Sequence, residues 1–293
     1  MPRIAYVNGQ YVPHGAAMVH VEDRGYQFAD GVYEVIAVHG GKFLGEKGHL
    51  DRLAHSLSEL RIDWPMARKP LAMVLREVAR RNGVRDGLIY LQITRGVAPR
   101  DHPFPTNAKS ALVVTAVKRP PIDKQSLLSG IDVISIPDIR WPRRDIKSVS
   151  LLPNVLGKQA AVEAGAQEAW QVDDDGYVTE GTATNAWIVT QDGELVTRDV
   201  SQSILNGITR LAILEAAREK DVNIVERPFT VEEVIGAKEA FLSSSNGHVK
   251  AVTRIDGKSI GNGQAGELTT RLFDIYMAYM ESVGGPQQTD RWN

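Results

Sequence analysis

The sequence predicts an α+β fold with largely antiparallel sheets. Three features favour this class: dipeptides that accept positive φ recur between β-rich segments, helical patterns are interspersed among these segments, and strands and helices do not alternate as in a doubly wound parallel sheet. The turn dipeptides are Asn8-Gly9, Gly40-Gly41, Asp175-Gly176, Asp192-Gly193 and Asp256-Gly257.

Apolar residues at helical spacing predict the positions of several helices. The faces comprise Leu50, Leu53, Leu57 and Leu60, then Leu71, Val74, Leu75 and Val78, and later Ile208, Leu211, Ile213 and Leu214. A final helix is expected over Leu268 to Met280, and another helical run begins just beyond Lys147.

A Pro-rich polar stretch indicates where the chain divides. The strand-like run from Ala111 to Val117 ends in K-R-P-P-I-D-K-Q, which is typical of an interdomain linker. We therefore expect an N-terminal domain over residues 1–118, a linker over 119–128, a larger C-terminal domain over 129–284 and a disordered tail over 285–293.

Composition excludes several classes of protein. With 293 residues, 43% hydrophobic and 24% charged, the chain is of ordinary globular type. A formal net charge of −2 gives no overall attraction to nucleic acid or to anionic membranes, and no apolar run approaches the roughly 18 residues needed to span a bilayer. The chain has no cysteine, which rules out disulfides and thiol chemistry and fits a reducing cytoplasm. A cytoplasmic enzyme with no nucleic-acid or membrane partner is the expectation.

Two motifs pair a candidate reactive lysine with a candidate carboxylate. The first, D-I-K-S-V-S-L-L-P-N-V-L-G-K-Q, runs from Asp145 to Gln159, and the second, E-G-T-A-T-N, starts at Glu180. An amine that attacks a carbonyl needs a lowered pKa, which burial or a cationic neighbour provides, and Lys147 lies beside apolar residues. Without this context Lys147 would be interpreted as a solvated surface lysine, and Glu180 as a polar residue that closes a hairpin.

The two motifs resemble those of the fold-type IV pyridoxal-phosphate (PLP) enzymes, the family of branched-chain and D-amino-acid aminotransferases. The resemblance implies a small N-terminal α/β domain, a larger PLP-binding C-terminal domain, PLP in the cleft between them and a homodimer. It makes Lys147 the catalytic lysine that forms a Schiff base with PLP and then moves protons. It makes Glu180 the carboxylate that keeps the pyridine nitrogen protonated.

The cofactor phosphate needs backbone donors and positive charge. The segment L-N-G-I-T-R, from Leu205 to Arg210, combines a Gly-containing turn with the start of a helix, where N–H groups lack acceptors. A turn with a cap, a polar loop that leaves a strand and a surface arginine are the plain alternatives for these segments. The resemblance assigns cofactor contacts to Ile208, Thr209, Ser244, Ser245 and Arg52.

The substrate class depends on two further segments. Arg100 and His102 lie two apart in T-R-G-V-A-P-R-D-H-P-F-P, so they could converge on one carboxylate, and Tyr33 could add a hydroxyl. A solvated loop pair and a half-buried strand aromatic are the alternatives. Together with the block E-D-R-G-Y-Q-F-A-D-G-V-Y-E at Glu22 to Glu34, these residues resemble the substrate-carboxylate trap of D-amino-acid aminotransferases.

The resemblance therefore implies ping-pong transamination between a D-amino acid and a 2-oxo acid such as 2-oxoglutarate or pyruvate. Two activities of the family remain as alternatives, namely branched-chain L-amino-acid transamination and aminodeoxychorismate lyase activity. A catalytically silent PLP-binding or scaffold protein is the alternative from another class. No metal site is expected, because His49 and His55 lack the H-E-x-x-H pattern, and D-G-K-S at Asp256 lacks the first glycine of a P-loop.

Overall fold

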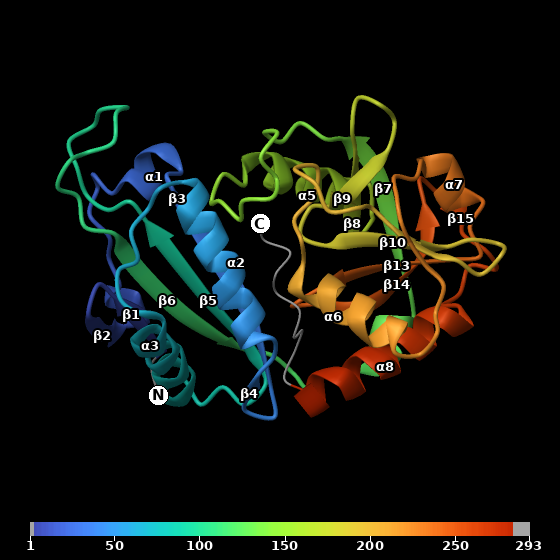
Figure 1. Cartoon of the computed structure of the whole chain (residues 1–293), viewed down its shortest axis with the longest axis horizontal. Coiled ribbons are helices and arrows are strands. Elements are labelled where there is room, and N and C mark those ends of the chain that lie inside the picture. The colour runs from blue at the N-terminus through green and yellow to red at the C-terminus, as the bar shows by residue number, and fades with distance from the viewer. Residues whose placement is uncertain (1–2, 284–293) are drawn as a thin grey trace. The chain divides into compact units, whose positions relative to one another are not determined.

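The computed structural model describes residues 3–283, which form two compact units (Figure 1). The first unit comprises the chain up to Ile122 and the short segment Ile146–Ser150, and the second comprises Asp123–Asp145 and the chain from Leu151 onward. Both units combine helices with sheets in which antiparallel pairs predominate, which confirms the predicted α+β class.

The division differs in detail from the predicted domains. The segment Ile146–Ser150, which lies within the predicted C-terminal domain, groups with the first unit, and a helix at Lys124–Leu128 lies within the predicted linker. The domain limits stay a prediction, because a compact unit need not fold alone. The tail predicted over 285–293 lies outside the described residues.

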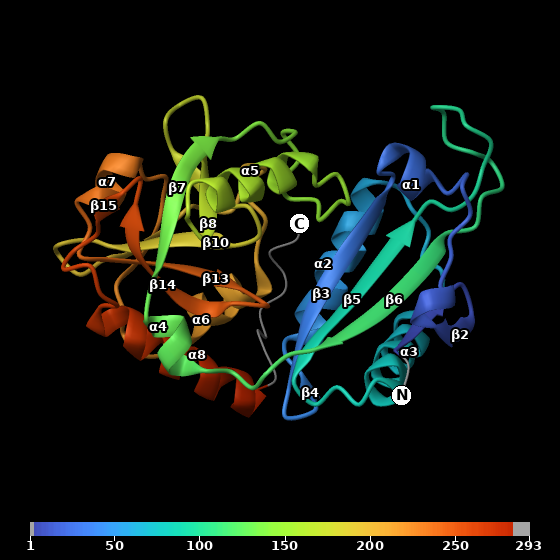
Figure 2. The same ribbon diagram turned by 180° about the vertical axis from the view of Figure 1, so that it is seen from behind.

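An antiparallel sheet forms the centre of the first unit, with strand order β2-β1-β6-β5-β3-β4. Helices α2 and α3 cover one face (Figure 1), and the view from behind shows strands β3, β5 and β6 from the other side (Figure 2). The strands are β1 (Ile4–Val7), β2 (Gln10–Pro13), β3 (Gly31–His39), β4 (Lys42–Phe43), β5 (Gly87–Thr94) and β6 (Ala111–Lys118). The helices are the short 3-10 turn η1 (His14–Ala16), α1 (Arg24–Phe28), α2 (Glu46–Glu59) and α3 (Arg68–Arg81).

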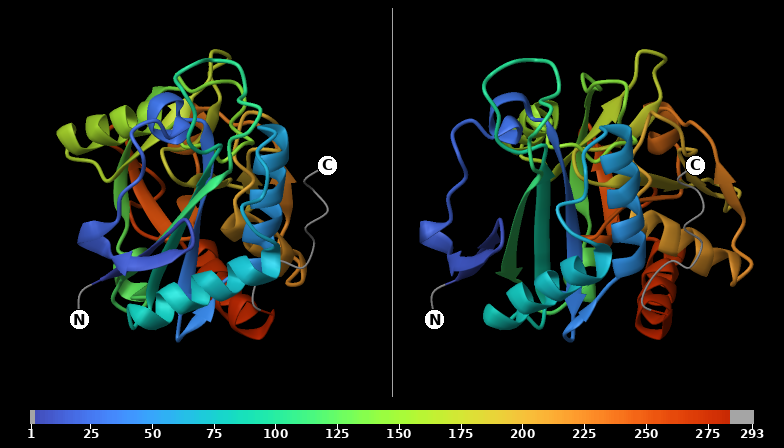
Figure 3. Two further views of the ribbon diagram at one scale, coloured as in Figure 1. Left: turned by 90° about the vertical axis from the view of Figure 1, so that its left-hand side faces the viewer. Right: turned by 60° about the vertical axis from the view of Figure 1, so that its left-hand side comes forward.

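The predicted sequence patterns produce this layer. Asn8 and Gly9, with φ of 45° and 99°, close the β1–β2 hairpin, since the positive φ matches the twist of tightly joined strands. The apolar faces of α2 and α3 are buried against strand residues such as Ile36 and Ile89, as the helical spacing predicted. Between β5 and β6, a long loop extends beyond the end of the sheet (Figure 3).

A larger sheet forms the second unit, with order β12-β11-β10-β13-β14-β7-β8-β9 and with β15 paired to β14. Three pairs in it are parallel: β11–β12, β14–β7 and β7–β8. Its strands are β7 (Ile131–Pro137), β8 (Glu168–Val172), β9 (Val178–Gly181), β10 (Asn185–Val189), β11 (Leu195–Thr197), β12 (Ile224–Glu226), β13 (Glu239–Ser244), β14 (His248–Ile255) and β15 (Lys258–Ser259). Its helices are α4 (Lys124–Leu128), α5 (Leu152–Glu163), α6 (Ile208–Arg218), α7 (Val231–Ile235) and α8 (Glu267–Val283).

Helices α6 and α8 pack on each other and against β13, and they lie side by side in Figure 1. The core of this unit is rich in large aromatic side chains, because Trp170, Trp187, Phe229 and Phe241 are all completely buried. The D-G-K-S segment forms the β14–β15 hairpin turn, as predicted. Among residues 3–283, no helix has the length and apolar character needed to cross a bilayer.

Candidate active site

Lys147 lies on a short segment that is fastened to strand β3. The Lys147 carbonyl accepts from Tyr33 N at 3.0 Å, and Val149 N donates to the Gly31 carbonyl at 3.0 Å. Lys147 N also donates to the Ser56 hydroxyl on α2 at 3.1 Å. The side chain turns back over β3, so that Nζ lies 3.3 Å from the Tyr33 hydroxyl and 4.3 Å from the centre of its ring. The fold thus holds this amine beside a phenol on an anchored backbone.

Three buried ionisable side chains lie next to this segment. Glu34 on β3 accepts two hydrogen bonds from the Arg52 guanidinium, both 2.7 Å long, and one from the His49 ring at 2.7 Å. Burial would raise the pKa of Glu34, but the charges and hydrogen bonds of Arg52 and His49 lower it to about 2. Burial lowers the pKa of His49 against the opposing effect of Glu34, so His49 is neutral at neutral pH. Arg52 and Glu34 therefore form a buried ion pair inside the first unit.

The Glu34 carboxylate should be a large source of pH-dependent stability. Since its pKa is about 2 in the folded protein and about 4.5 in the unfolded chain, its contribution of about 3 kcal/mol is present above pH 4.5 and is lost as the pH falls toward 2. Glu34→Gln should lower the free energy of unfolding by about 3–5 kcal/mol at pH 7, because it leaves the buried Arg52 charge uncompensated. Urea denaturation at several pH values checks this.

Glu77 provides the control for that measurement. Its pKa is also lowered to about 2, by hydrogen bonds from Arg80 and Arg81, but its ion pairs lie on the exposed surface of α3. Glu77→Gln should leave the unfolding transition nearly unchanged, because water screens exposed pairs. Equal losses in the two variants would show that burial of Glu34 is not the cause.

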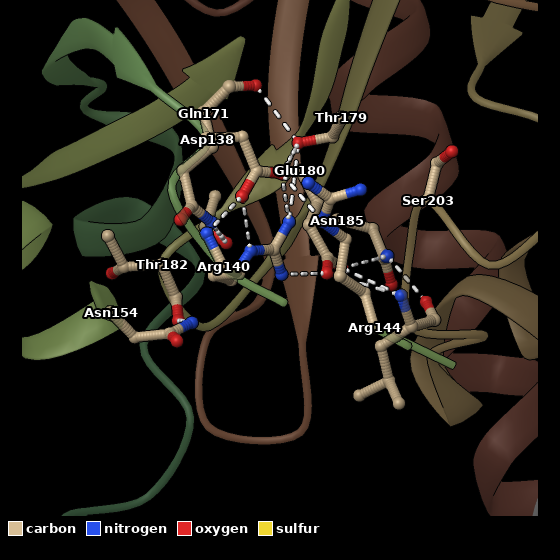
Figure 4. Close-up of polar contacts among 12 residues, drawn as sticks. Asp138, Arg140, Arg144, Asn154, Gln171, Thr179, Glu180, Thr182, Asn185 and Ser203 are labelled. Carbon is tan, nitrogen blue, oxygen red and sulfur yellow. Dashed lines mark hydrogen bonds and ion pairs between the residues drawn. The ribbon is translucent and has the colours of Figure 1, made fainter. Parts of the chain in front are cut away.

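In the second unit, Glu180 lies at the end of β9 and is buried, with only 5% of its surface exposed. Arg140 donates to Oε1 at 2.5 Å, Leu205 N lies 3.2 Å from both carboxylate oxygens, and the Asn185 amide donates to Oε2 at 3.2 Å (Figure 4). Asn185 also donates to the Leu205 carbonyl at 2.9 Å, which joins the E-G-T-A-T-N motif to the L-N-G-I-T-R segment. Two motifs that are separate in the sequence therefore meet at one carboxylate.

Arg140 links Glu180 to a second carboxylate, Asp138. The guanidinium of Arg140 donates to Asp138 Oδ2 at 2.7 Å, and Thr179 donates to the same oxygen at 2.7 Å (Figure 4). Burial would lower the pKa of Arg140, but Glu180 and Asp138 raise it well above its usual range. A permanently charged guanidinium beside Glu180 favours the ionised form of this carboxylate.

The predicted phosphate-binding residues of the second unit lie on two elements that contact each other. Ile208 and Thr209 begin α6 behind Gly207, where the first N–H groups of a helix have no intrahelical acceptor. Ser244 ends β13, and its hydroxyl accepts from Gly247 N at 2.9 Å within the turn to β14. The Thr209 side chain contacts the Tyr276 hydroxyl, which lies 3.3 Å from Nδ1 of His248 at the end of the same turn.

The predicted carboxylate-binding residues fall into two groups in the first unit. Arg100 and His102, in the loop between β5 and β6, both contact the Phe28 ring, at centroid distances of 4.7 Å and 5.5 Å. Tyr33 instead contacts Lys147 and stacks on Tyr90, with ring centres 5.7 Å apart. Within residues 3–283, no hydrogen bond, ion pair or ring contact joins Tyr33 to the Arg100 pair.

Sequence reasoning missed several residues of these clusters. Arg140 and Asp138 lie far from Glu180 in the sequence, in a segment without a motif, so that only the fold shows their role. His49 was considered only as a metal ligand, whereas it contacts Glu34. Alternation along β3 could have indicated Glu34, because it occupies an inward-facing position among apolar residues and so needs a buried partner.

Similarity to known proteins agrees with this arrangement. Residues 31–255 match the family described as amino-transferase class IV. The chain is 39% identical to a D-alanine aminotransferase from Staphylococcus haemolyticus over 277 residues, which cover 94% of this chain and 98% of the relative. It is 41% identical to a D-alanine aminotransferase from Bacillus licheniformis over 269 residues, which cover 90% and 93%. The chain belongs to the class IV aminotransferase family.

Solved structures share the fold. A branched-chain amino acid aminotransferase from Escherichia coli superposes with a TM-score of 0.87 at 25% identity and covers 95% of this chain and 94% of its own. A branched-chain amino acid aminotransferase from T.th., solved with pyridoxamine 5'-phosphate, has a TM-score of 0.87 at 26% identity and covers 100% and 98%. These likenesses confirm the predicted fold-type IV architecture.

Proposed function

We propose that this chain catalyses PLP-dependent transamination between a D-amino acid and a 2-oxo acid. Relatives named D-alanine aminotransferases, 39–41% identical over nearly the full chain, support this substrate class. The observation that carries the proposal is the anchored Lys147 amine, which faces the Tyr33 hydroxyl at 3.3 Å and has no ion-pair partner among residues 3–283. An amine without an acidic partner can react with a carbonyl and can exchange protons.

The residues present fit PLP. Lys147 would bind its aldehyde, and Glu180, already surrounded by donors, would hold the proton on its ring nitrogen. The N–H groups of Ile208 and Thr209 and the hydroxyls of Ser244 and Ser245 would bind its phosphate. Thr184 Oγ1, in the turn that follows Glu180, is buried and has no hydrogen-bond partner within residues 3–283.

Arg52 would contribute positive charge near the phosphate, as the family resemblance implies. Its guanidinium is already bound to Glu34 through Nε and Nη2. Glu34 would therefore set the orientation of Arg52, since a bidentate pair with a carboxylate fixes the plane of the guanidinium.

When bound, PLP supplies an electron sink that stabilises the charge left at Cα after proton removal. The Lys147 amine would take the Cα proton and return a proton during the second half of the exchange, acting as base and then as acid. Tyr33 would orient this amine through its hydroxyl. The substrate carboxylate would bind Arg100 and His102, with Tyr33 as a further donor.

A product assay tests this proposal against its rivals. Purified protein with PLP is incubated with D-alanine, with L-leucine, each with 2-oxoglutarate, and with aminodeoxychorismate. We expect D-alanine to be consumed, with pyruvate and glutamate as products. L-leucine as the sole donor would favour the branched-chain activity, release of pyruvate from aminodeoxychorismate would favour the lyase, and no turnover of any of them would favour a silent binding protein.

The homodimer and the cytoplasmic location implied by the family resemblance stay predictions. Size-exclusion chromatography with light scattering tests the first, with about twice the mass of one 32.2 kDa chain expected. The 2-oxo acid acceptor, 2-oxoglutarate or pyruvate, is distinguished by comparing initial rates with each.

A further inference from the structure

The loop that carries Arg100 and His102 is pinned at its base. Its two ends meet at Gly96 and Lys109, where a Cβ added to Gly96 would lie only 1.9 Å from the Lys109 carbonyl. The first part of the loop is bound by the chain before α1, because Arg24 N donates to the Gly96 carbonyl at 2.9 Å and Ala98 N donates to the Glu22 carbonyl at 3.3 Å. Beyond this base, residues 99–104 are exposed.

One buried side chain holds the exposed part. The Arg24 guanidinium, with 3% of the residue exposed, donates to the carbonyls of three consecutive loop residues: Asp101 at 2.6 Å, His102 at 3.2 Å and Pro103 at 3.4 Å. Its third nitrogen, Nε, donates to Asp30 at 2.8 Å. The planar fork of an arginine can make all of these bonds at once, whereas the ammonium of a lysine is a single point charge.

The anchor of Arg24 is itself fixed. Asp23 caps α1 by accepting from Gly25 N at 2.8 Å and also accepts from the Thr94 hydroxyl on β5 at 2.9 Å. Asp30 also binds Arg95 with two bonds, of 2.7 Å and 2.9 Å, so that Asp30 cannot turn away from Arg24 without losing both partners. The loop is thus bonded to a rigid group at the end of the sheet.

The Phe28 ring, one turn further along α1, organises the side chains of this region. The guanidinium carbons of Arg24 and Arg100 lie 4.8 Å and 4.7 Å from its centroid, and the His102 ring lies 5.5 Å away. Arg24 holds the backbone at position 102 while Phe28 holds the side chains at positions 100 and 102. Both interactions bring the two cationic groups to one ring, as recognition of a single carboxylate requires.

We propose that Arg24 is a positioning residue for the substrate carboxylate: through the carbonyls of residues 101–103 it keeps Arg100 and His102 oriented toward one anion. This inference rests on the proposed function, since it assumes that Arg100 and His102 bind the α-carboxylate. Arg24 itself is buried and acts through the loop. Amino acids and 2-oxo acids both carry this carboxylate, so the affinity for both substrates should depend on Arg24.

The test uses the holoenzyme variants Arg24→Met and Arg24→Lys. We expect KM for D-alanine and for 2-oxoglutarate to rise together, about 10- to 100-fold for Arg24→Met, with kcat changed by less than about 3-fold. Arg24→Lys should fall between wild type and Arg24→Met, because it restores charge but not the fork. A second readout needs no turnover: trypsin should cut after Arg100 faster in the purified variants than in wild type.

Asn82→Ala is the matched control. Asn82 also joins separate backbone segments of the first unit, since its side chain donates to the carbonyls of Ile4 and Val78 and accepts from Ile4 N. This variant should lose stability but keep both KM values and the rate of cutting after Arg100. If Arg24→Met behaved in the same way, the positioning role would be overturned.

Two other outcomes separate this inference from the proposed function. If wild-type protein turns over no amino acid while Arg24→Met is cut faster after Arg100, the proposed function fails and the hold of Arg24 on the loop stands. If wild type is active and Arg24→Met loses kcat with unchanged KM, Arg24 acts elsewhere and the inference is wrong. An Arg100→Met variant with raised KM for both substrates completes the support, because it links the loop directly to the carboxylate.

Discussion

Lys147→Ala should abolish transamination, with kcat/KM reduced by about 10⁴-fold or more, because the side chain would supply both the covalent link to the cofactor and the group that moves the Cα proton. The fold should persist, since the Lys147 side chain is only half-buried and the segment is anchored by its backbone bonds to Tyr33, Gly31 and Ser56. Initial rates with D-alanine and 2-oxoglutarate measure the loss, and thermal unfolding checks the fold.

Two variants control this experiment. Lys147→Arg keeps a cation near Tyr33, but a guanidinium stays protonated at any accessible pH, so it should be as inactive as the alanine variant. Lys158→Ala removes a lysine from the exposed side of α5, where it pairs with Glu168 at 3.7 Å, and should keep wild-type activity.

Chemical labelling distinguishes catalysis from structure at Lys147. Borohydride reduction of the holoenzyme, followed by peptide mapping, should place the cofactor on the peptide that contains Lys147. A label on another peptide, or an active Lys147→Ala enzyme, would contradict the assignment.

Local patterns were sufficient to predict most of the fold. Hairpins at Asn8-Gly9 and Gly40-Gly41 follow from residues that accept positive φ, and the apolar faces of α2 and α3 follow from spacing alone. The parallel pairs β14–β7 and β7–β8 were not predicted, since pairing between distant strands is decided by tertiary packing.

The candidate residues divide in the same way. Lys147, Glu180 and the R-x-H pair could be found because each lies in a short motif with a recognisable order. Partners that come from elsewhere in the chain could not be found: Arg140 lies 40 residues before Glu180, and Arg24 lies 77 residues before Asp101. Long-range hydrogen bonds leave no local pattern, so the environment of each motif residue became visible only in the fold.

Glu180→Gln should lower kcat by about 10²- to 10³-fold, the usual effect of removing one preorganised electrostatic partner from an active site. A neutral amide cannot hold a proton on the ring nitrogen of PLP by charge attraction, so the electron sink weakens. The amide also removes the charge that Arg140 contacts at 2.5 Å, although Asp138 still balances the guanidinium. Steady-state rates measure the effect on kcat, and the visible absorbance of the bound cofactor reports its changed ring environment.

Glu168→Gln is the matched control, because Glu168 is a second buried carboxylate in the adjoining strand β8. Its surface is 3% exposed, and it accepts from Ala169 N at 2.9 Å and from Thr182. This variant should lose stability as Glu180→Gln does, but it should keep kcat within about 3-fold and leave the cofactor spectrum unchanged. Equal losses of kcat in both variants would mean that any buried carboxylate of this sheet supports activity through folding, and the assignment of Glu180 to the cofactor ring would be wrong.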